Sequence, residues 1–226
     1  MSGRAGFLPD EIEITPDLVL RAYGAGLFPM AENRSDRRLY WVDPDHRGIL
    51  PLATFHVPRS LRKTLRRGDF EIRCDTAFEA VIRACAEPGP GRAETWISDE
   101  IIRLYAALNR MGHAHSVECW RDGQLAGGLY GISLGGAFFG ESMFSHQTDA
   151  SKIALVHLVA RLRKSGYLLL DTQFVTEHLE RFGVIEVPRA TYRTLLAEAL
   201  AVAARFQSDL APGELAALAQ SSTQTS

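Results

Sequence analysis

The sequence predicts an α/β protein with a mixed β-sheet from about residue 50 onward and a small unit before it. Two observations lead to this prediction. The dipeptide Asp122-Gly123 joins two strand-like segments, 114–121 and 124–134, which is typical of an antiparallel hairpin. Farther along, an amphipathic helix over 149–164 precedes the apolar run 167–170, which is typical of a strand buried on both faces. Hairpins and helical crossovers together require antiparallel and parallel strand pairs.

Composition is that of an ordinary soluble globular protein. The 226 residues are 46% hydrophobic and 23% charged. The three cysteines form no CxxC pair, so we expect no disulfide framework, no zinc site and a reducing compartment. The first residues lack the apolar core of a secretory signal, and no run approaches the ~20 apolar residues of a membrane span. We therefore expect a cytoplasmic protein.

The small unit, predicted over residues 1–48, begins with a helix. Thr15 is placed to cap it, Pro16 suits its first position, and a glycine at 24 or 26 ends it. Residues 28–30 are expected to leave the helix as an apolar projection. Short strands follow at 39–42 and 48–51.

The main domain is predicted over residues 49–210. Ser98 is placed to cap one of its helices, which Gly112 ends. Residues 211–226 are rich in small and polar side chains and are predicted to form a flexible tail. The remaining elements are predicted as a strand at 69–75, helices at 76–83, 177–182 and 188–206, a loop at 87–92, and a strand at 184–187.

The stretch 127–152 is the most informative part of the chain. It begins as a strand at a diglycine and turns at Gly135-Gly136, and Glu141 follows where we expect the extended chain to stop. Glycine inside a strand often marks the close approach of a ligand to the backbone. Asp149 or Ser151 is placed to cap the helix that comes next. We expect Glu141 to face a cleft with apolar neighbours.

A basic segment contrasts with the overall net charge of −2. If this segment, residues 59–67, forms a helix, its cations share one face, and Leu61 and Leu65 lie on the opposite face. A solvated surface is the alternative interpretation. The segment has no acidic partner to offset repulsion between its like charges, and a polyanion would relieve it, so we predict phosphate binding. The five cations are Arg59, Arg62, Lys63, Arg66 and Arg67.

The candidate site residues point away from a covalent enzyme intermediate and from ATP or nicotinamide chemistry. Asp171 and Gln173 follow the buried strand 167–170, and ligand sites in α/β sheets lie at such strand ends. The sequence has no nucleophile triad, Walker loop or GxGxxG motif. His113 and His115 lack an evident third ligand, so we expect them to be structural and predict no metal and no cofactor. Transfer from an activated ester to an amine needs little beyond orientation and oxyanion support, and fits these residues.

Six motifs occur in an order that resembles the leucyl/phenylalanyl-tRNA–protein transferases. They are GLFP, TWI, GHAHSVE, GGLYG, FFGESMFS and DASKIAL, within about residues 15–192. The resemblance implies a GNAT-like acyltransferase domain after a small N-terminal domain. It implies transfer of Leu or Phe, and less readily Met, from aminoacyl-tRNA to the α-amino group of proteins that begin with Lys or Arg. It also implies that this transfer marks the acceptor for N-end-rule degradation, and we expect a monomer without membrane contact.

The resemblance also implies roles for individual residues. Asp171 and Gln173 match the family's D-x-Q pair, in which the Asp positions the Gln against the attacking amine. Glu141 matches the Glu of GESMF, near the ester and the amine. The basic segment matches the cluster that contacts the tRNA acceptor stem. The implied pocket for the donor side chain consists of Met30, Trp96, Leu129, Phe138, Leu158, Leu162 and Leu170.

The sequence departs from the family pattern at some of these positions, and three alternatives stay open. Met30 stands where Trp is frequent, and Thr172 where Cys is common. An acyl-CoA-dependent acetyltransferase would need a glycine-rich pyrophosphate loop near residues 145–152, where this chain has an Asp and no glycine. An RNA-binding protein without catalysis would use only the basic segment. A ligase that aminoacylates cell-wall peptides would differ in the acceptor alone.

Overall fold

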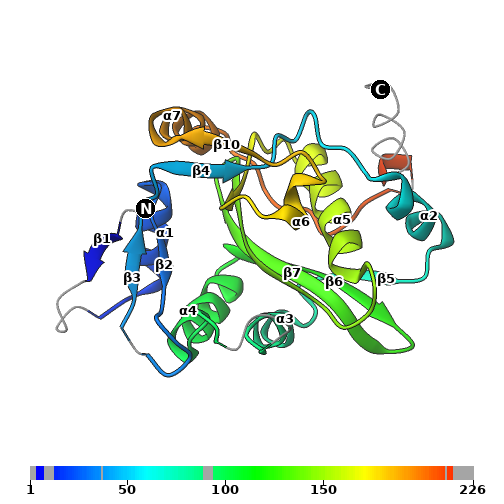
Figure 1. Ribbon diagram of the computed structural model, residues 1–226, viewed down its shortest axis with the longest axis horizontal. Coiled ribbons are helices and arrows are strands. Elements are labelled where there is room, and N and C mark those ends of the chain that lie inside the picture. Colours follow the sequence, from blue (N-terminus) through cyan, green and yellow to red (C-terminus); the bar gives the residue numbers. More distant parts are fainter. Residues whose placement is uncertain (1–3, 8–12, 37, 89–93, 212, 216–226) are drawn as a thin grey trace.

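A mixed seven-stranded sheet forms the centre of the computed structural model, which describes residues 4–7, 13–36, 38–88, 94–211 and 213–215 (Figure 1). The strand order is β10-β4-β9-β8-β7-β6-β5, and the neighbours are antiparallel except for the parallel pair β8 and β9. The predicted mixed α/β fold is confirmed. The strands are β4 (His46–Ile49), β5 (Glu71–Cys74), β6 (Ala114–Arg121), β7 (Gln124–Leu134), β8 (Ala137–Ser145), β9 (Leu169–Gln173) and β10 (Ile185–Pro188).

A second, three-stranded sheet lies at the left-hand end in Figure 1, beside helix α1 (Pro16–Gly24). Its order is β1 (Arg4–Phe7), β3 (Tyr40–Val42), β2 (Phe28–Met30). The expected apolar projection at 28–30 is therefore wrong, because these residues pair with β3 as a strand. The Thr15 hydroxyl accepts from the Leu18 N–H at 3.2 Å, so the predicted N-cap is confirmed. The predicted boundary at residue 48 falls inside β4, which belongs to the larger sheet.

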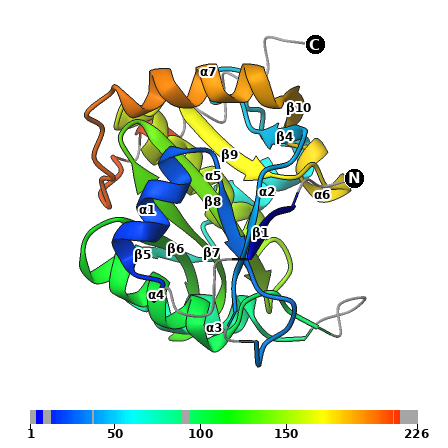
Figure 2. The same cartoon turned by 90° about the vertical axis from the view of Figure 1, so that its left-hand side faces the viewer.

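Helices cover both faces of the large sheet, and the buried hydrophobic residues form two clusters. One cluster joins α1, α3 (Phe78–Cys85) and α4 (Asp99–Arg110) with the small sheet and α7 (Arg189–Leu200). The other joins α2 (Arg59–Arg67) and α5 (Ala150–Lys164) with the opposite face. The four-residue helix α6 (Glu177–Glu180) follows β9, and α7 lies along the β4–β10 side of the sheet (Figure 2).

Several helix ends differ from the predictions, and two of them involve contacts with other elements. The last helix ends at Leu200 rather than at 206, and the chain beyond it packs on the sheet, where the Phe206 ring stacks on His115 at 4.4 Å. Asp149 lies at the N-terminus of α5 with a φ of 68°, but its side chain makes no capping bond. Its carboxylate instead accepts from Thr64 and Lys152. Much of the predicted tail, 212 and 216–226, and part of the predicted loop, 89–93, lie outside the described residues.

β8 and β9 separate part-way along their length. The two parallel strands pair only from Ala137 with Leu169 to Phe139 with Asp171, yet β8 continues to Ser145. The prediction that the extended chain stops near residue 141 is therefore wrong, because β7 holds β8 along its other edge. The pairing shifts at Glu141, an extra residue in β8 between Gly140, which faces Gly131, and Ser142, which faces Tyr130. The polar residues Glu141 and Gln173 lie where the two strands have parted.

The Glu118 carboxylate lies fully buried under α3. It accepts from the Ala77 N–H and the Ser116 hydroxyl at 2.8 Å, from the Trp120 indole N–H at 3.0 Å, and from the Thr76 hydroxyl. Ala77, at the start of α3, has no side chain that could cap the helix. Glu118 therefore supplies the cap from the neighbouring strand.

We expect Glu118→Gln to lower the free energy of unfolding by roughly 1–3 kcal/mol, because an amide NH₂ would then face buried donors. Urea unfolding followed by circular dichroism measures this. Glu71→Gln on β5, whose partner Arg73 lies on the surface, is the control and should leave the midpoint nearly unchanged. Equal midpoints for Glu118→Gln and the parent protein would contradict the capping role.

Candidate active site

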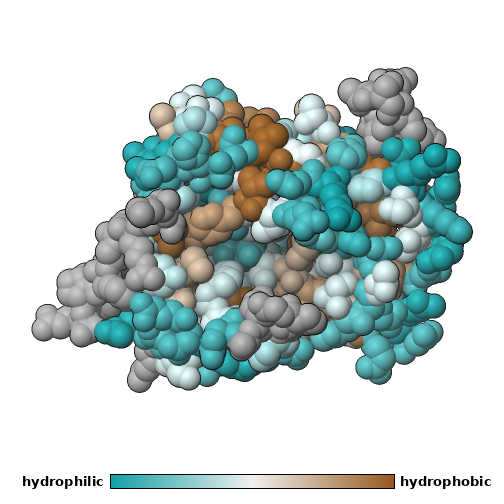
Figure 3. Space-filling model, viewed as in Figure 1, coloured by the Kyte–Doolittle hydropathy of each residue, from teal (hydrophilic) through white to brown (hydrophobic). Residues whose placement is uncertain are grey.

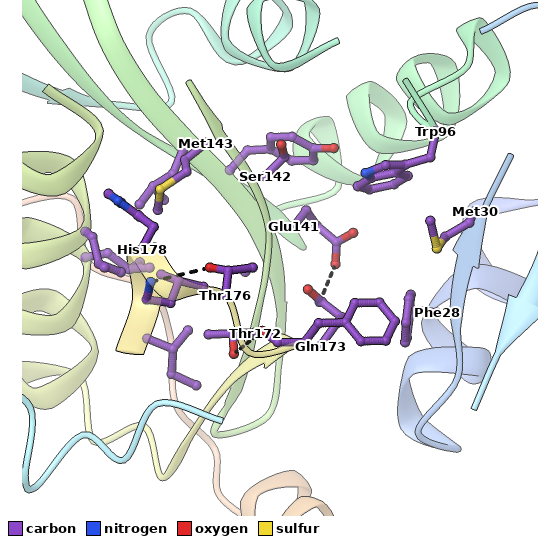
Figure 4. Close-up of a pocket in the computed structure, with 18 residues that line it drawn as sticks. Phe28, Met30, Trp96, Glu141, Ser142, Met143, Thr172, Gln173, Thr176 and His178 are labelled. Atoms are coloured by element: carbon purple, nitrogen blue, oxygen red, sulfur yellow. Dashed lines mark hydrogen bonds between the residues drawn. The ribbon is translucent and has the colours of Figure 1, made fainter. Parts of the chain in front are cut away.

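A mostly apolar cavity of about 430 Å³ opens where β8 and β9 part. Its size is within the usual range of small-molecule sites. Figure 3 shows a hollow near the middle of this face, with hydrophobic residues along its upper edge, and Figure 4 shows the side chains. The lining residues are Phe28, Met30, Trp96, Leu129, Tyr130, Gly140, Glu141, Ser142, Met143, Leu155, Leu158, Leu170, Thr172, Gln173, Phe174, Thr176, His178 and Leu179.

Glu141 is held by two phenols. Its carboxylate accepts from the Tyr23 hydroxyl of α1 at 2.7 Å and from the Tyr105 hydroxyl of α4 at 3.2 Å, and the two phenol oxygens also contact each other. Burial raises the pKa of Glu141 to about 8, and the nearby charge of Asp171 adds to the rise, while the phenol hydrogen bonds oppose it. Glu141 can therefore take up and release a proton near neutral pH.

Gln173 ends β9 in a strained turn. Its φ is 56°, in the left-handed region that residues other than glycine rarely adopt, and the Phe174 N–H donates to the Thr172 carbonyl at 2.6 Å across it. The side-chain amide donates to Glu141 at 3.4 Å (Figure 4). Gly48 of β4 allows this turn to approach, because a Cβ there would lie 2.7 Å from the Phe174 carbonyl carbon. The turn thus aims the amide at the carboxylate.

Asp171 does not reach the cavity. Its side chain is 0% exposed, and its oxygens accept from Arg47 Nε at 3.0 Å, Arg47 Nη2 at 2.7 Å, the Tyr192 hydroxyl at 2.6 Å and the Gln173 N–H at 2.8 Å. The structure therefore brings the three predicted residues together, with Glu141 and Gln173 in the cavity wall and Asp171 behind them.

Sequence reasoning missed Arg47 and Tyr192. The predicted strand began at Gly48, whereas β4 begins at His46 and carries Arg47 into the core, with 1% exposure. No local signal marked Arg47, because the acidic partner that allows its burial lies 124 residues away in the sequence.

Five of the seven predicted pocket residues line the cavity, and two do not. Phe138 and Leu162 are 0% exposed and belong to the core cluster beneath the cavity. The Phe138 ring packs on Tyr167 and Phe206, because its side chain points from β8 toward the C-terminal segment. The cavity wall is completed by Phe28, Met143, Leu155, Phe174 and Leu179, which the sequence prediction lacked. Phe28 and Phe174 contact edge-to-face at 5.8 Å between ring centroids.

The basic segment forms helix α2, and most of its cations are exposed while its opposite side packs on the core, as predicted. Leu61 and Thr64 are buried against the core, and Arg59, Lys63, Arg66 and Arg67 are exposed. The Arg62 guanidinium is half-buried and donates to the Val57 carbonyl at 2.9 Å. Arg67 pairs with Asp69 just beyond the helix at 2.8 Å, so one cation is partly neutralised. The exposed face is otherwise strongly positive.

Comparison with known proteins identifies the family. The model described as "Leucyl/phenylalanyl-tRNA protein transferase" matches residues 49–197, and the model of that family's N-terminal domain matches residues 12–45. The chain belongs to this family. Two transferases of the same description are similar over nearly their whole length. That of Paramagnetospirillum magneticum is 65% identical over 193 residues, which is 85% of this chain and 92% of the relative. That of Maricaulis maris is 58% identical over 210 residues, which is 92% of this chain and 96% of the relative.

These matches confirm the resemblance inferred from the motifs, and with it an aminoacyl-tRNA-dependent transferase. Solved structures are less similar. A protein of unknown function from Staphylococcus epidermidis has a TM-score of 0.41 at 11% identity and covers 80% of this chain and 68% of its own. L-PGS from Bacillus licheniformis has a TM-score of 0.40 at 15% identity, covering 70% and 53%. Likeness at this level carries no functional argument.

The described residues include neither a membrane-spanning helix nor a cluster of metal-ligating side chains. No helix among them has the length and the apolar character to cross a bilayer. They contain no group of three or more His, Cys, Asp or Glu side chains that could hold a metal ion. His115 bonds to Asp75 at 2.8 Å, and His113 bonds to the Ser133 carbonyl at 3.3 Å.

We expect Tyr23→Phe to raise the pKa of Glu141 above its value of about 8. The hydrogen bond from the Tyr23 hydroxyl stabilises the ionised carboxylate, and the substitution removes it. Titration of ¹³C-labelled glutamate carboxyls by NMR measures the change. Tyr167→Phe, which loses a hydroxyl bonded to Ser133 elsewhere in the core, is the control and should leave this titration in place. An unchanged or lower pKa in Tyr23→Phe would contradict the assigned contact.

Proposed function

We propose that the cavity receives the aminoacyl end of leucyl- or phenylalanyl-tRNA and that the acceptor's α-amino group attacks the ester carbonyl beside Glu141 and Gln173. One observation carries this proposal: an amide and a carboxylate face each other at 3.4 Å in the wall of a mainly apolar cavity. The apolar part suits the donor side chain, and the polar pair suits the reacting groups.

In the proposed step the neutral amine nitrogen bonds to the ester carbonyl carbon, and the bond from that carbon to the ribose oxygen breaks. The nitrogen gives one proton to the Glu141 carboxylate, which passes it to the departing ribose oxygen. An α-amino group has a pKa of about 7.7–8.0, so much of it is neutral without a strong base. A carboxyl with a pKa of about 8 is well matched to accept and return this proton. Gln173 orients the amine through its amide oxygen.

The lining supports the predicted choice of donor. Leu, Phe and, less readily, Met fit a cavity walled by leucines and methionines, and such a surface discriminates by only about 1–3 kcal/mol per methylene. Met30 and Trp96 stand together at one end because the Ala31 N–H donates to the Trp96 carbonyl at 3.3 Å. They extend the apolar wall of the pocket for the donor side chain.

The acceptor is a protein that begins with Lys or Arg, and the transferred residue marks it for N-end-rule degradation. Its cationic side chain near the cavity would favour the ionised form of Glu141. The α2 face binds acceptor-stem phosphates through its exposed cations, which makes binding dependent on salt and largely independent of sequence. The protein acts as a cytoplasmic monomer and needs no cofactor.

A transfer assay tests the proposal. The donors are leucyl-, phenylalanyl- and methionyl-tRNA with labelled amino acids, and the acceptors are peptides that begin with Lys, Arg or Ala. We expect label on the Lys and Arg peptides and little on the Ala peptide. Glu141→Gln and Gln173→Ala should each lower kcat by on the order of 10²-fold, because proton transfer or orientation is lost. Gln147→Ala is the control and should keep the parent kcat, because Gln147 lines a different cavity. Wild-type rates in both site variants would refute this site.

For α2, we expect the double variant Lys63→Ala/Arg66→Ala to raise the KM for leucyl-tRNA without lowering kcat. The slope of log KM against log salt concentration should fall by about 2, one for each lost phosphate contact. Arg83→Ala/Arg110→Ala removes two exposed cations from α3 and α4, on the other face of the sheet, and should change neither quantity. Equal effects of the two double variants would show that α2 is not a specific tRNA surface.

A further inference from the structure

Arg47 is the largest fully buried side chain among the described residues, and its surroundings are unusual for a cation. The guanidinium lies between two aromatic rings, 4.4 Å from the Phe28 centroid and 4.6 Å from the Tyr192 centroid. Removing such a charge from water is costly unless it is paired and hydrogen-bonded. Arg47 meets this condition through Asp171, so the two residues stabilise each other in one arrangement.

The carboxylate oxygens of Asp171 accept hydrogen bonds from four donor groups of the protein itself. Nε and Nη2 of Arg47 form a two-pronged contact with its carboxylate, Tyr192 adds a hydroxyl, and the Gln173 N–H supplies the fourth donor. With 0% exposure, Asp171 cannot touch a substrate amine. Among the described residues, its only hydrogen-bonded route to the cavity wall is through Gln173, while its charge acts on Glu141 from behind.

The Gln173 turn depends on this support. A non-glycine residue with a φ of 56° is costly and persists only where its surroundings fix it. Its N–H points to Asp171 Oδ1 at 2.8 Å, and its side chain is 7% exposed, so no water replaces that acceptor readily. If the carboxylate rotated, the N–H would lose its partner and the amide would lose its direction toward Glu141.

Arg47 also contacts the element that holds Glu141. Its Nη1 donates to the Gly26 carbonyl at 3.1 Å, two residues after α1 ends. α1 carries Tyr23, which donates to Glu141 at 2.7 Å. One guanidinium thus connects the strand that ends in Gln173 with the helix that fixes Glu141.

We propose that Arg47 is a positioning residue for aminoacyl transfer. It sets the direction of the Gln173 amide through Asp171 and the placement of α1 through Gly26, while touching no substrate itself. Tyr192 assists by fixing the second carboxylate oxygen. The inference rests on the proposed role of Gln173 and adds the residues through which that role is established.

The test is a mutant cycle in the transfer assay with leucyl-tRNA and an N-terminal Arg peptide. Arg47→Lys keeps the charge but loses the two-pronged contact. We expect it to lower kcat by roughly 10- to 100-fold, because a small misplacement of a positioned group has effects of this size, and to leave the KM for leucyl-tRNA within about twofold. Adding Arg47→Lys to Gln173→Ala should lower kcat by a smaller factor than it does in the parent protein, because one of the two routes through which Arg47 acts is already gone.

Arg161→Lys is the matched control. Arg161 is also buried, at 5% exposure, but donates to backbone carbonyls of His157 and Ser208. We expect Arg161→Lys to reduce kcat only slightly, and by the same factor in the parent protein and in Gln173→Ala. Thermal unfolding of each variant sets an assay temperature at which all are folded, and Tyr192→Phe repeats the cycle with a milder change if Arg47→Lys fails to fold.

Two results would overturn the inference. A folded Arg47→Lys protein with the parent kcat would do so, as would an equal loss of kcat with and without Gln173. If Gln173→Ala alone kept the parent kcat, the proposed role of Gln173 would fall first and the inference with it. A loss in Gln173→Ala together with additive effects of Arg47→Lys would remove the inference alone.

Discussion

The short pairing of β8 with β9 is the constraint on which the site depends. The two strands share three residue pairs, from Ala137 with Leu169 to Phe139 with Asp171, and then diverge. Because β7 satisfies the backbone of β8 beyond that point and β4 satisfies β9, neither strand needs the other to complete its hydrogen bonds. A space can therefore open inside a continuous sheet. The cavity occupies it, and Glu141 from the middle of β8 and Gln173 from the end of β9 supply its facing polar pair.

Two carboxylates lie near this opening in opposite surroundings. Asp171 is enclosed by a guanidinium, a phenol and a backbone N–H, which fix it in place. Glu141 has two phenols as partners, and its pKa of about 8 follows mainly from burial. The same functional group is thus suited to support in one case and to proton exchange in the other, and the difference arises from neighbours on distant elements.

Much of this could be predicted from the sequence, where local signals were strong. The hairpin at Asp122-Gly123, the caps at Thr15 and Ser98, and the motif residues Glu141, Asp171 and Gln173 are local features, and the structure brings the last three together. The directions of Phe138 and Leu162 could not be predicted, because they depend on core packing between distant elements, such as the contact of the Phe138 ring with Phe206. The partner of Arg47 lies 124 residues away, so no local pattern indicates it.

The cavity wall comes from two separate sources. Phe28 and Met30 belong to the small sheet, whereas the groups assigned to the chemistry lie on β8 and β9 of the large one. Substitution of Met30 can therefore reshape the volume offered to a donor side chain, whereas Phe28 also packs on the Arg47 guanidinium and on Phe174 beside Gln173. In evolutionary terms, part of the preference among donors is encoded on a strand that carries neither Glu141 nor Gln173, so related enzymes can vary position 30 and keep this pair.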